Sequence, residues 1–264
     1  MDGDMEEGAK LLREALRLDP DGEGAKVALK QCRFVQTTLQ EARRGVFHRN
    51  FAAAVDLFQK ILDDVRPLPP RSHLYCLCHS EKSHAHLRLK QHSLALKHSA
   101  TALASRDDLE PAWLVRAQAL GALERHTEAA DALAGPLATW GSDRPALRDA
   151  HAQAVFEVRQ AQRPDYYALL GSPRVASERE IRRLYKEKAR ELHPDRWSGG
   201  SEEEKKSAEE GFRLLGEGVE VLTDEFRRGL YDQGHDLASI NERVAAAQQE
   251  AKRAQGKYRP HGHH

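Results

Sequence analysis

The sequence predicts an all-α protein in which a solenoid of helical hairpins precedes a smaller helical domain. The 264-residue chain is rich in Ala and Leu, and only 6% of it is aromatic, a composition typical of helical arrays rather than sheets. Ala54, Ala95 and Ala129 each lie near the start of an apolar helical pattern, at intervals of 41 and 34 residues. Nearer the C-terminus, two amphipathic helical patterns flank a His-Pro-Asp tripeptide at 193–195.

The charge balance and the cysteines limit the possible classes of function. The chain carries 41 basic and 41 acidic side chains, and this zero net charge excludes a globally basic protein that coats nucleic acid. No apolar run reaches the roughly 18 residues of a membrane span, and the acidic opening does not resemble a signal peptide. Cys32, Cys76 and Cys78 give no disulfide framework, which indicates a reducing compartment. We therefore expect a cytoplasmic or nuclear protein without nucleic-acid or membrane partners.

Residues 1–33 are expected to form a partial repeat or a capping helix. The segment 11–20 has apolar residues at helical spacing and closes with Pro20. In this it resembles the second helix of a tetratricopeptide repeat. No first helix precedes it, so we expect either an incomplete repeat or a helix that caps the array.

Residues 34–144 are expected to form about three tetratricopeptide-like repeats. The 34-residue interval equals the period of that repeat. The other interval is seven residues longer, and Pro67, Pro69 and Pro70 mark where the extra residues form a loop. A small residue at each Ala position allows the paired helices to approach closely. Such repeats stack into a curved array with a concave binding surface.

The match to the repeat is partial. Phe51 and Phe58 flank the first Ala, and Trp113 and Ala117 lie in the first helix of the third repeat. At three positions a polar residue replaces an expected aromatic one, and these are His92, Ser99 and His126. An ordinary bundle of helical hairpins is the alternative interpretation.

The second repeat is rich in residues that bind metals elsewhere. They are His73, Cys76, Cys78, His79, His84 and His86. On a helix, however, Cys76 and Cys78 point about 200° apart, and zinc sites use cysteines separated by two to four residues. We interpret these residues as parts of helix faces and predict no metal site.

Residues 145–163 are expected to form a connecting helix. Ser142 or Asp143 is the expected N-cap, Pro145 stands in the first turn, and Pro164 follows the end. At 1.5 Å per residue the helix would be roughly 27 Å long, a stiff strut between two domains.

A helix before the tripeptide has one cationic and one apolar face. It opens with a capping box at Ser177 and Glu180 and ends near Leu192, because the residue before a proline avoids helical geometry. The residues on the cationic face are Arg179, Arg182, Arg183, Lys186 and Arg190. Those on the opposite face include Ile181, Leu184, Tyr185 and Leu192.

A second helix follows the tripeptide after Gly199 and Gly200. It opens with another capping box, at Ser201 and Glu204. Its apolar stripe consists of Ala208, Phe212, Leu215, Val219 and Leu222. The two apolar faces predict an antiparallel pair that displays the tripeptide at its tip.

These residues resemble a J domain, the module of DnaJ, or heat shock protein 40, co-chaperones. The resemblance covers the segment from Asp165 to Asp232, and we expect the domain to span 164–235. Its residues are Asp165-Tyr166-Tyr167, Leu169, Leu170, Gly171, the basic helix, His193-Pro194-Asp195, Arg228, Tyr231 and Asp232. It implies a short first helix, the antiparallel pair and a fourth helix near 224–231. It also implies that His193, Pro194, Asp195, Arg179, Arg182, Arg183, Lys186 and Arg190 bind a DnaK-type heat shock protein 70 chaperone and stimulate its ATPase.

Two simpler interpretations of this site stay open. A cationic helix face is often only a solvated surface. His193 is alternatively a general base or a metal ligand, although no nucleophile, paired carboxylate or second ligand stands at useful spacing. We predict no catalytic residue, no cofactor and no ATP binding by the chain itself, because it lacks a G-x-x-x-x-G-K-[ST] loop.

The whole arrangement is a tetratricopeptide-like solenoid joined by a long helix to a four-helix J domain. It resembles cytosolic co-chaperones of the DnaJ homologue subfamily C member 7 type. The repeats are then expected to bind a client protein or a second chaperone. The alternatives are an endoplasmic-reticulum co-chaperone of similar layout, whose signal peptide would precede this sequence, and a scaffold with an inactive J domain.

Many repeat co-chaperones grip the acidic tail of a heat shock chaperone with a carboxylate clamp of Lys, Asn and Arg side chains. Aligning this chain on its three Ala positions places other residues there. They are Leu39, Arg43, Glu81, Pro111 and Val115. Only Arg43 is able to bind a carboxylate, and Glu81 would repel one. We therefore predict that the clamp is absent.

The remaining residues, 236–264, are rich in Ala, Gln and charged side chains. We expect a polar helix or a disordered tail there. The terminal His261, His263 and His264 belong to this tail, and they are either native or an expression tag.

Overall fold

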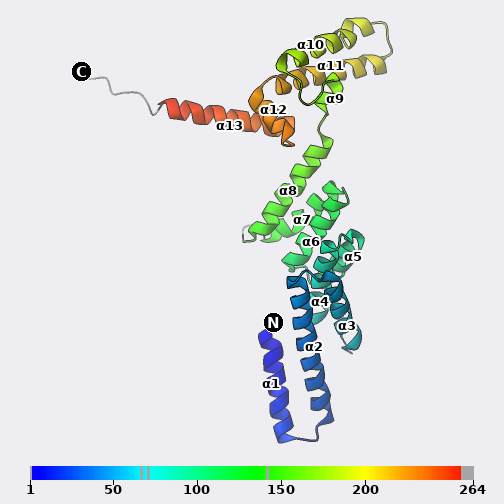
Figure 1. Cartoon of the computed structure of the whole chain (residues 1–264), viewed down its shortest axis with the longest axis vertical. Helices are drawn as coiled ribbons and strands as arrows, with labels where there is room; N and C mark the ends of the chain where they lie inside the picture. Colours follow the sequence, from blue (N-terminus) through cyan, green and yellow to red (C-terminus); the bar gives the residue numbers. More distant parts are fainter. Residues whose placement is uncertain (1, 66–67, 70–71, 141–142, 257–264) are drawn as a thin grey trace, which may run out of the picture. The chain divides into compact units, whose positions relative to one another are not determined.

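The computed structural model describes residues 2–65, 68–69, 72–140 and 143–256. The regular structure in these ranges is helical, which confirms the predicted all-α class (Figure 1). The predictions for Pro67, Pro70, Ser142 and the terminal histidines lie outside the described residues. Internal contacts divide the chain into two units, Met1–Glu157 and Val158–His264. Each unit is described separately below.

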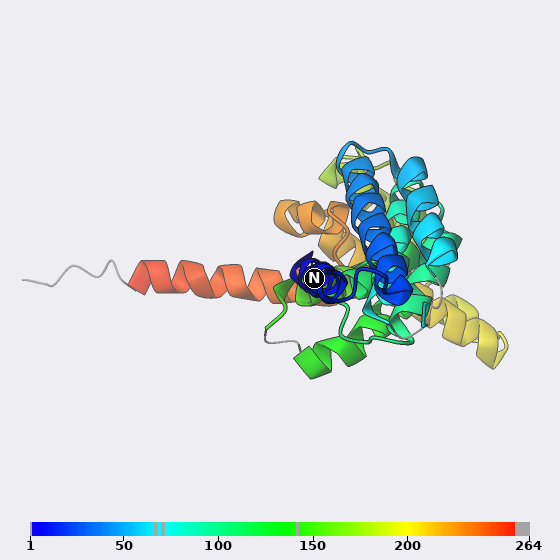
Figure 2. The same ribbon diagram turned by 90° about the horizontal axis from the view of Figure 1, so that it is seen from below.

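The first unit consists of successive helical hairpins (Figure 1). Its helices are α1 (Asp2–Leu18), α2 (Glu23–Phe47), α3 (Phe51–Asp64), α4 (His73–Arg88), α5 (His92–Leu103), α6 (Glu110–Ala122) and α7 (His126–Trp140). In Figure 2, α2 and α3 are seen side by side as one such pair, and the same pairing recurs in α4 with α5 and α6 with α7.

α1 packs against α2, and the Cys32 thiol donates a hydrogen bond to the Met5 carbonyl at 3.4 Å. α2 begins at Glu23, so the boundary expected between residues 33 and 34 falls inside a helix. No Gly or Pro interrupts residues 25–44, and the helix therefore has no breaker near that point.

The three hairpin turns share one unusual backbone feature. Arg49, Lys90 and Glu124 have positive φ angles of 61°, 59° and 59°, which non-glycine residues seldom adopt. They stand at the same 41- and 34-residue intervals as the three Ala positions. The amide that follows each of them closes the turn on a helix carbonyl, as in the Schellman motif. These bonds join Asn50 to Gly45 at 2.7 Å, Gln91 to His86 at 2.9 Å and Arg125 to Leu120 at 3.0 Å.

The packing inside the hairpins agrees with the repeat pattern. Ala54, Ala95 and Ala129 are all buried, and Phe58 is fully buried beside the first of them. A larger side chain at an Ala position would force the paired helices apart. The backbone turns and the buried small residues thus support three equivalent repeats.

The helix α8 (Pro145–Gln162) follows the third hairpin. Its Leu147 and Ala154 are buried with residues of α6 and α7. The division between the two units falls within this helix, and its role as a strut stays a prediction.

The second unit contains the short helices and the antiparallel pair expected of a J domain. Its elements are α9 (Tyr166–Leu170), α10 (Glu178–Glu191), the 3₁₀ turn η1 (Pro194–Trp197), α11 (Glu202–Leu222), α12 (Glu225–Asp232) and α13 (Leu237–Gly256). Both predicted capping boxes are present, at Ser177 with Glu180 and at Ser201 with Glu204.

The core of the second unit lies between α9, α10, α11 and α12. Of the predicted stripe on α11, Ala208, Leu215 and Leu222 are buried, while Phe212 and Val219 are half-buried. The predicted stripe did not include every buried residue of α11, because Gly218 and Val221 are buried as well. Val221 belongs to the apolar core of the second unit, and Gly218 packs against the Tyr166 ring.

α13 is not only a polar tail. Ile240 is fully buried in the core of the second unit, and Leu237 and Val244 pack against it. Arg227 of α12 also donates to the Asn241 side chain at 3.0 Å. The first turns of α13 therefore belong to the folded unit, and its remaining residues to 254 are almost all exposed.

Two buried tyrosines connect the ends of the second unit. The Tyr231 hydroxyl donates to the Pro164 carbonyl at 2.9 Å and accepts from the Tyr166 amide at 3.0 Å. The Tyr167 hydroxyl donates to Asp232 at 3.0 Å. These bonds fix α9 against α12. They explain why Tyr166-Tyr167 near the start of the domain occurs together with Tyr231-Asp232 near its end.

Candidate functional site

The tripeptide forms the corner between α10 and α11. α10 ends with Leu192 as its C-cap. His193 has an extended backbone (φ −61°, ψ 130°) and caps the 3₁₀ turn that begins at Pro194. A proline fits the first position of a helical turn because its missing N–H has no partner to lose there.

The His193 side chain is held on two sides but half exposed. Its ring lies edge-on to Phe212 of α11, with centroids 5.9 Å apart. Its Nδ1 accepts from the Asp195 amide at 3.3 Å. Because Nδ1 is an acceptor, the neutral ring carries its proton on Nε2. The Asp195 side chain is 90% exposed, so both side chains are accessible to a partner.

α10 lies close to α11 near this corner. A Cβ atom added to Gly211 would be only 3.1 Å from Leu192 Cδ1. This contact explains a glycine inside a helix, where it normally costs stability. No sequence pattern indicates this contact, because Gly211 carries no side chain to form part of an apolar stripe.

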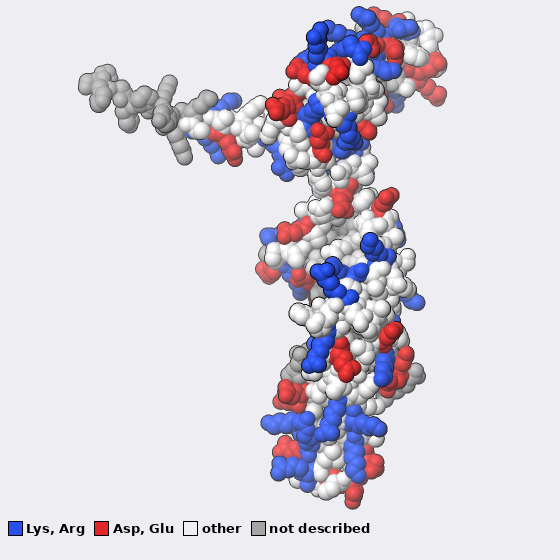
Figure 3. Space-filling view, in the orientation of Figure 1, with Lys and Arg blue, Asp and Glu red and all other residues white. Residues whose placement is uncertain are grey.

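The predicted cationic residues share one exposed face of α10 (Figure 3). The face is not purely cationic, however. Arg182 pairs with Glu178 and Arg183 pairs with Glu187, each at 2.7 Å. Such exposed pairs contribute only about 0.2–0.5 kcal/mol, so a stronger acidic partner can displace them.

The other cations of this face are less restrained. Among the described residues, no ion pair is recorded for Arg179, Lys186 or Arg190. The face also includes a shallow hollow. It is lined by Glu178, Arg179, Glu180, Arg182, Arg183 and Lys186. The structure thus brings the predicted cations and the tripeptide together in one unit, along α10 and at its C-terminal end.

Two residues beside the tripeptide were not predicted. Arg196 Nη1 donates to the Arg190 carbonyl at 3.2 Å, and Trp197 Nε1 donates to the Glu191 carbonyl at 3.2 Å. Both side chains reach back from η1 to the end of α10. Their position directly after the tripeptide is the only sequence signal that points to them.

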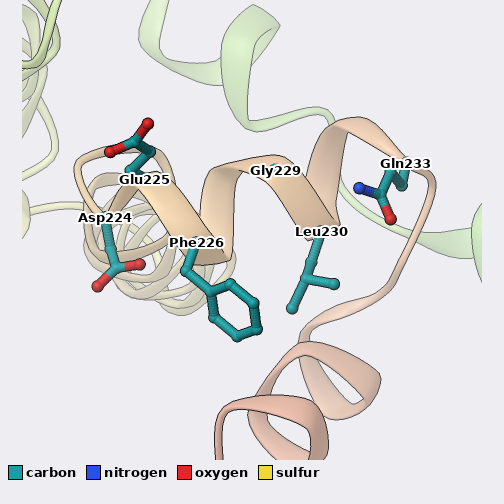
Figure 4. Close-up of a pocket in the computed structure, with 6 residues that line it drawn as sticks. All are labelled: Asp224, Glu225, Phe226, Gly229, Leu230 and Gln233. Atoms are coloured by element: carbon teal, nitrogen blue, oxygen red, sulfur yellow. The ribbon is translucent and has the colours of Figure 1, made fainter. Parts of the chain in front are cut away.

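A separate hollow lies on α12 (Figure 4). Its lining residues are Asp224, Glu225, Phe226, Gly229, Leu230 and Gln233. Phe226 is 52% exposed, and Figure 4 shows its ring beside the Leu230 side chain. None of the predicted site residues lines this hollow, so it is distinct from the candidate site.

The first unit places the expected clamp positions in unsuitable environments. Leu39 is 2% exposed and Val115 is 5% exposed, so both belong to the core. Arg43 Nε lies 3.5 Å from Glu81 Oε1. The single cation at these positions is thus already paired with a carboxylate of the neighbouring repeat.

The His and Cys residues of α4 lie mostly inside the repeats. Cys76 and Cys78 are both fully buried, and burial raises the pKa of the Cys78 thiol to about 12. Within the described ranges, no group of three or more His, Cys, Asp and Glu residues is arranged to hold a metal ion. His79 instead contacts His98 of α5, with their Nδ1 atoms 2.9 Å apart.

No helix in the described part of the chain is long and apolar enough to cross a membrane.

The fold and the tripeptide at the tip of a paired helix define a J domain. Residues 165–232 match the family model described as the DnaJ domain. Residues 165–232 of the second unit therefore form a J domain, and the chain combines it with tetratricopeptide-like repeats.

Several relatives match most of the chain, among them these three. DnaJ homolog subfamily C member 7 of Mus musculus is 29% identical over 234 residues, which are 88% of this chain and 46% of that protein. The subfamily C member 7 homolog of Schizosaccharomyces pombe is 30% identical over 225 residues, 85% of this chain and 45% of that protein.

The third relative is the tetratricopeptide repeat and J domain-containing co-chaperone of Cryptococcus neoformans. It is 28% identical over an aligned length of 259 residues, which covers 87% of this chain and 47% of that protein. The chain spans a little under half the length of these relatives. It is similar to DnaJ homolog subfamily C member 7 over most of its own length.

Proposed function

We propose that this chain is a co-chaperone whose J domain binds a DnaK-type heat shock protein 70 and stimulates its ATP hydrolysis. The observation that carries the proposal is the exposure of His193 and Asp195 of the tripeptide, which lies at the end of a helix with an exposed cationic face. A partner can contact both features at once because they belong to the same folded unit.

The charges on α10 would act mainly during association. Exposed cations attract an acidic surface and increase the rate of encounter. His193 and Asp195 would then make the short-range contacts, with a ring N–H donor and the exposed Asp195 carboxylate, which lies 3.4 Å from His193 Nδ1. The J domain supplies no catalytic group in this proposal, since hydrolysis takes place in the partner.

The repeats would bind a client protein or a second chaperone. We propose that they do so without a carboxylate clamp. This is supported by the burial of Leu39 and Val115 and by the Arg43–Glu81 pair. We also propose a cytoplasmic location with access to the nucleus, and no direct binding to nucleic acid or membranes. Cell fractionation tests this location against the endoplasmic reticulum.

The central test is a single-turnover ATP hydrolysis assay with purified heat shock protein 70 and the whole chain. The rate constant should increase with chain concentration and saturate. A chain that binds the chaperone but leaves the rate unchanged would be a scaffold with an inactive J domain. A chain that neither binds nor stimulates would refute the proposal.

A further inference from the structure

The turn that carries the tripeptide is fastened to α10 by two side chains. Arg196 donates to the Arg190 carbonyl and Trp197 donates to the Glu191 carbonyl, both at 3.2 Å. Ser198 adds a bond within the turn, from its hydroxyl to the Asp195 carbonyl at 3.0 Å.

These bonds replace two backbone bonds that the tripeptide itself removes. In a continuing α-helix, the Arg190 carbonyl would accept from the amide of residue 194, and the Glu191 carbonyl from the amide of residue 195. Residue 194 is a proline and has no N–H. The Asp195 amide is engaged by His193 Nδ1. Both carbonyls would otherwise depend on water, as the last carbonyls of helices usually do.

We propose that Arg196 and Trp197 are positioning residues, which hold the tripeptide in its binding conformation before a partner arrives. The proposal rests on the co-chaperone function proposed above. The loop continues into Gly199 and Gly200, which favour many backbone conformations. Without the two side-chain bonds, η1 would be joined to α10 only through the backbone at 192–193, and its contacts with α11 would be the remaining restraint on the turn. The fraction of chains ready to bind would fall, and the apparent dissociation constant would rise in inverse proportion.

The variants Trp197→Phe and Arg196→Met each remove one donor and keep most of the side-chain volume. A neutral hydrogen bond contributes about 1 kcal/mol, which corresponds to roughly a fivefold change in an equilibrium. We expect the chain concentration for half-maximal ATPase stimulation to rise by up to about fivefold in Trp197→Phe, and by a larger factor in Arg196→Met, whose guanidinium is a charged donor. The maximal rate should stay at the wild-type value, and the thermal midpoint should fall by only a few degrees.

Two controls separate this role from general effects of substitution. Arg196→Lys keeps a donor and should behave nearly as the wild type. Trp140→Phe makes the same exchange in α7, in the first unit. It should change neither the chain concentration for half-maximal stimulation nor the maximal rate. If Trp197→Phe and Arg196→Met leave half-maximal stimulation unchanged, the positioning role is wrong.

A measurement on the free chain makes the test independent of the partner. Backbone ¹⁵N order parameters at His193 and Asp195 should fall in both variants and stay unchanged in Trp140→Phe. If the wild type does not stimulate ATP hydrolysis, the proposed function fails, while the order parameters still decide whether these side chains hold the turn. Unchanged order parameters would overturn the inference even if stimulation falls, since the side chains would then act by touching the partner.

Discussion

His79 Nδ1 lies 2.9 Å from His98 Nδ1 across the interface of α4 and α5, inside the second repeat. The His98 ring also stacks on His86, with centroids 5.2 Å apart. The charged neighbours that act on these rings are cations, Lys82 of α4 and Lys97 of α5. A proton on any of the three rings would therefore be both desolvated and repelled.

This cluster predicts that acid destabilises the repeats. Burial, with a smaller contribution from Lys82, lowers the pKa of His79 to about 4, and burial lowers the pKa of His98 to about 4 as well. An unfolded histidine has a pKa near 6.5. The folded state thus favours the neutral rings, and this stabilisation is complete above about pH 6.5 and is lost as the pH falls toward 4. We expect a loss of about 2 kcal/mol from each of the two histidines, or about 4 kcal/mol in total, between pH 7.5 and pH 5.

Tryptophan fluorescence during urea unfolding can measure this loss. A Trp197→Phe background leaves only Trp113 and Trp140, both in the repeats. Adding His79→Gln and His98→Gln should flatten the pH dependence, whereas His48→Gln at an exposed position should preserve it. Equal pH dependence with and without the two buried histidines would contradict the prediction.

Two glycines of α11 should respond in opposite directions to the same substitution. A Cβ on Gly218 would lie 3.1 Å from the Tyr166 ring, whereas a Cβ on Gly216 meets nothing within 4 Å. Gly216→Ala should stabilise the J domain by about 0.5–1 kcal/mol through helix propensity. Gly218→Ala should destabilise it by about 1–3 kcal/mol through overpacking. Thermal unfolding measures both, and stabilisation by Gly218→Ala would show that the helices do not approach so closely.

His193→Gln should abolish stimulation of the partner's ATPase without unfolding the J domain. The side chain is half exposed, so its loss removes little buried area. Circular dichroism checks the fold and single-turnover hydrolysis checks the function. The matched control is His48→Gln, which changes an exposed histidine of the first unit. Wild-type stimulation by a well-folded His193→Gln chain would refute the assigned role of the tripeptide.

Reversing two cations of α10 should slow association. In Arg182→Glu with Arg183→Glu, the new carboxylates would face Glu178 and Glu187, so a small loss of helix stability, about 0.2–0.5 kcal/mol per pair, is also expected. Wild-type binding should weaken with added salt, because exposed charges are screened over about 8 Å at physiological ionic strength.

The control for this variant changes net charge by the same amount elsewhere. Lys252→Glu with Arg253→Glu alters the exposed end of α13 and should leave the association rate near the wild-type value. Binding of the wild type that does not vary between about 50 and about 500 mM salt, where the screening length falls from roughly 14 to 4 Å, would argue against electrostatic docking.

The repeats should not bind the acidic C-terminal tail of a heat shock chaperone with micromolar affinity. A charge-assisted hydrogen bond contributes about 1.5–3 kcal/mol, and of the five clamp positions only Arg43 carries a cation, which faces Glu81. Titration of a fluorescent tail peptide onto the whole chain measures this. Tight, salt-sensitive binding would show that a clamp is built from other residues, and Glu81→Gln would then be expected to strengthen it.

The sequence by itself determined the features that depend on neighbouring residues or on a fixed repeat. The capping boxes at Ser177 and Ser201 each need only four consecutive residues, and both formed as predicted. The ends of α10 follow from Ser177 and Pro194. The intervals between Ala54, Ala95 and Ala129 indicate equivalent repeats because a solenoid reuses one packing contact.

The tertiary structure decided which side chains from distant segments meet. No local pattern indicates that Ile240 is buried in the core of the second unit, that Arg43 reaches Glu81, or that His79 and His98 face each other. These contacts depend on how neighbouring helices rotate and pack, which periodicity alone does not specify. For the same reason, only the structure reveals that Trp197 donates a hydrogen bond to the Glu191 carbonyl at the end of α10. This bond forms because the turn at the tripeptide brings the Trp197 side chain back to α10.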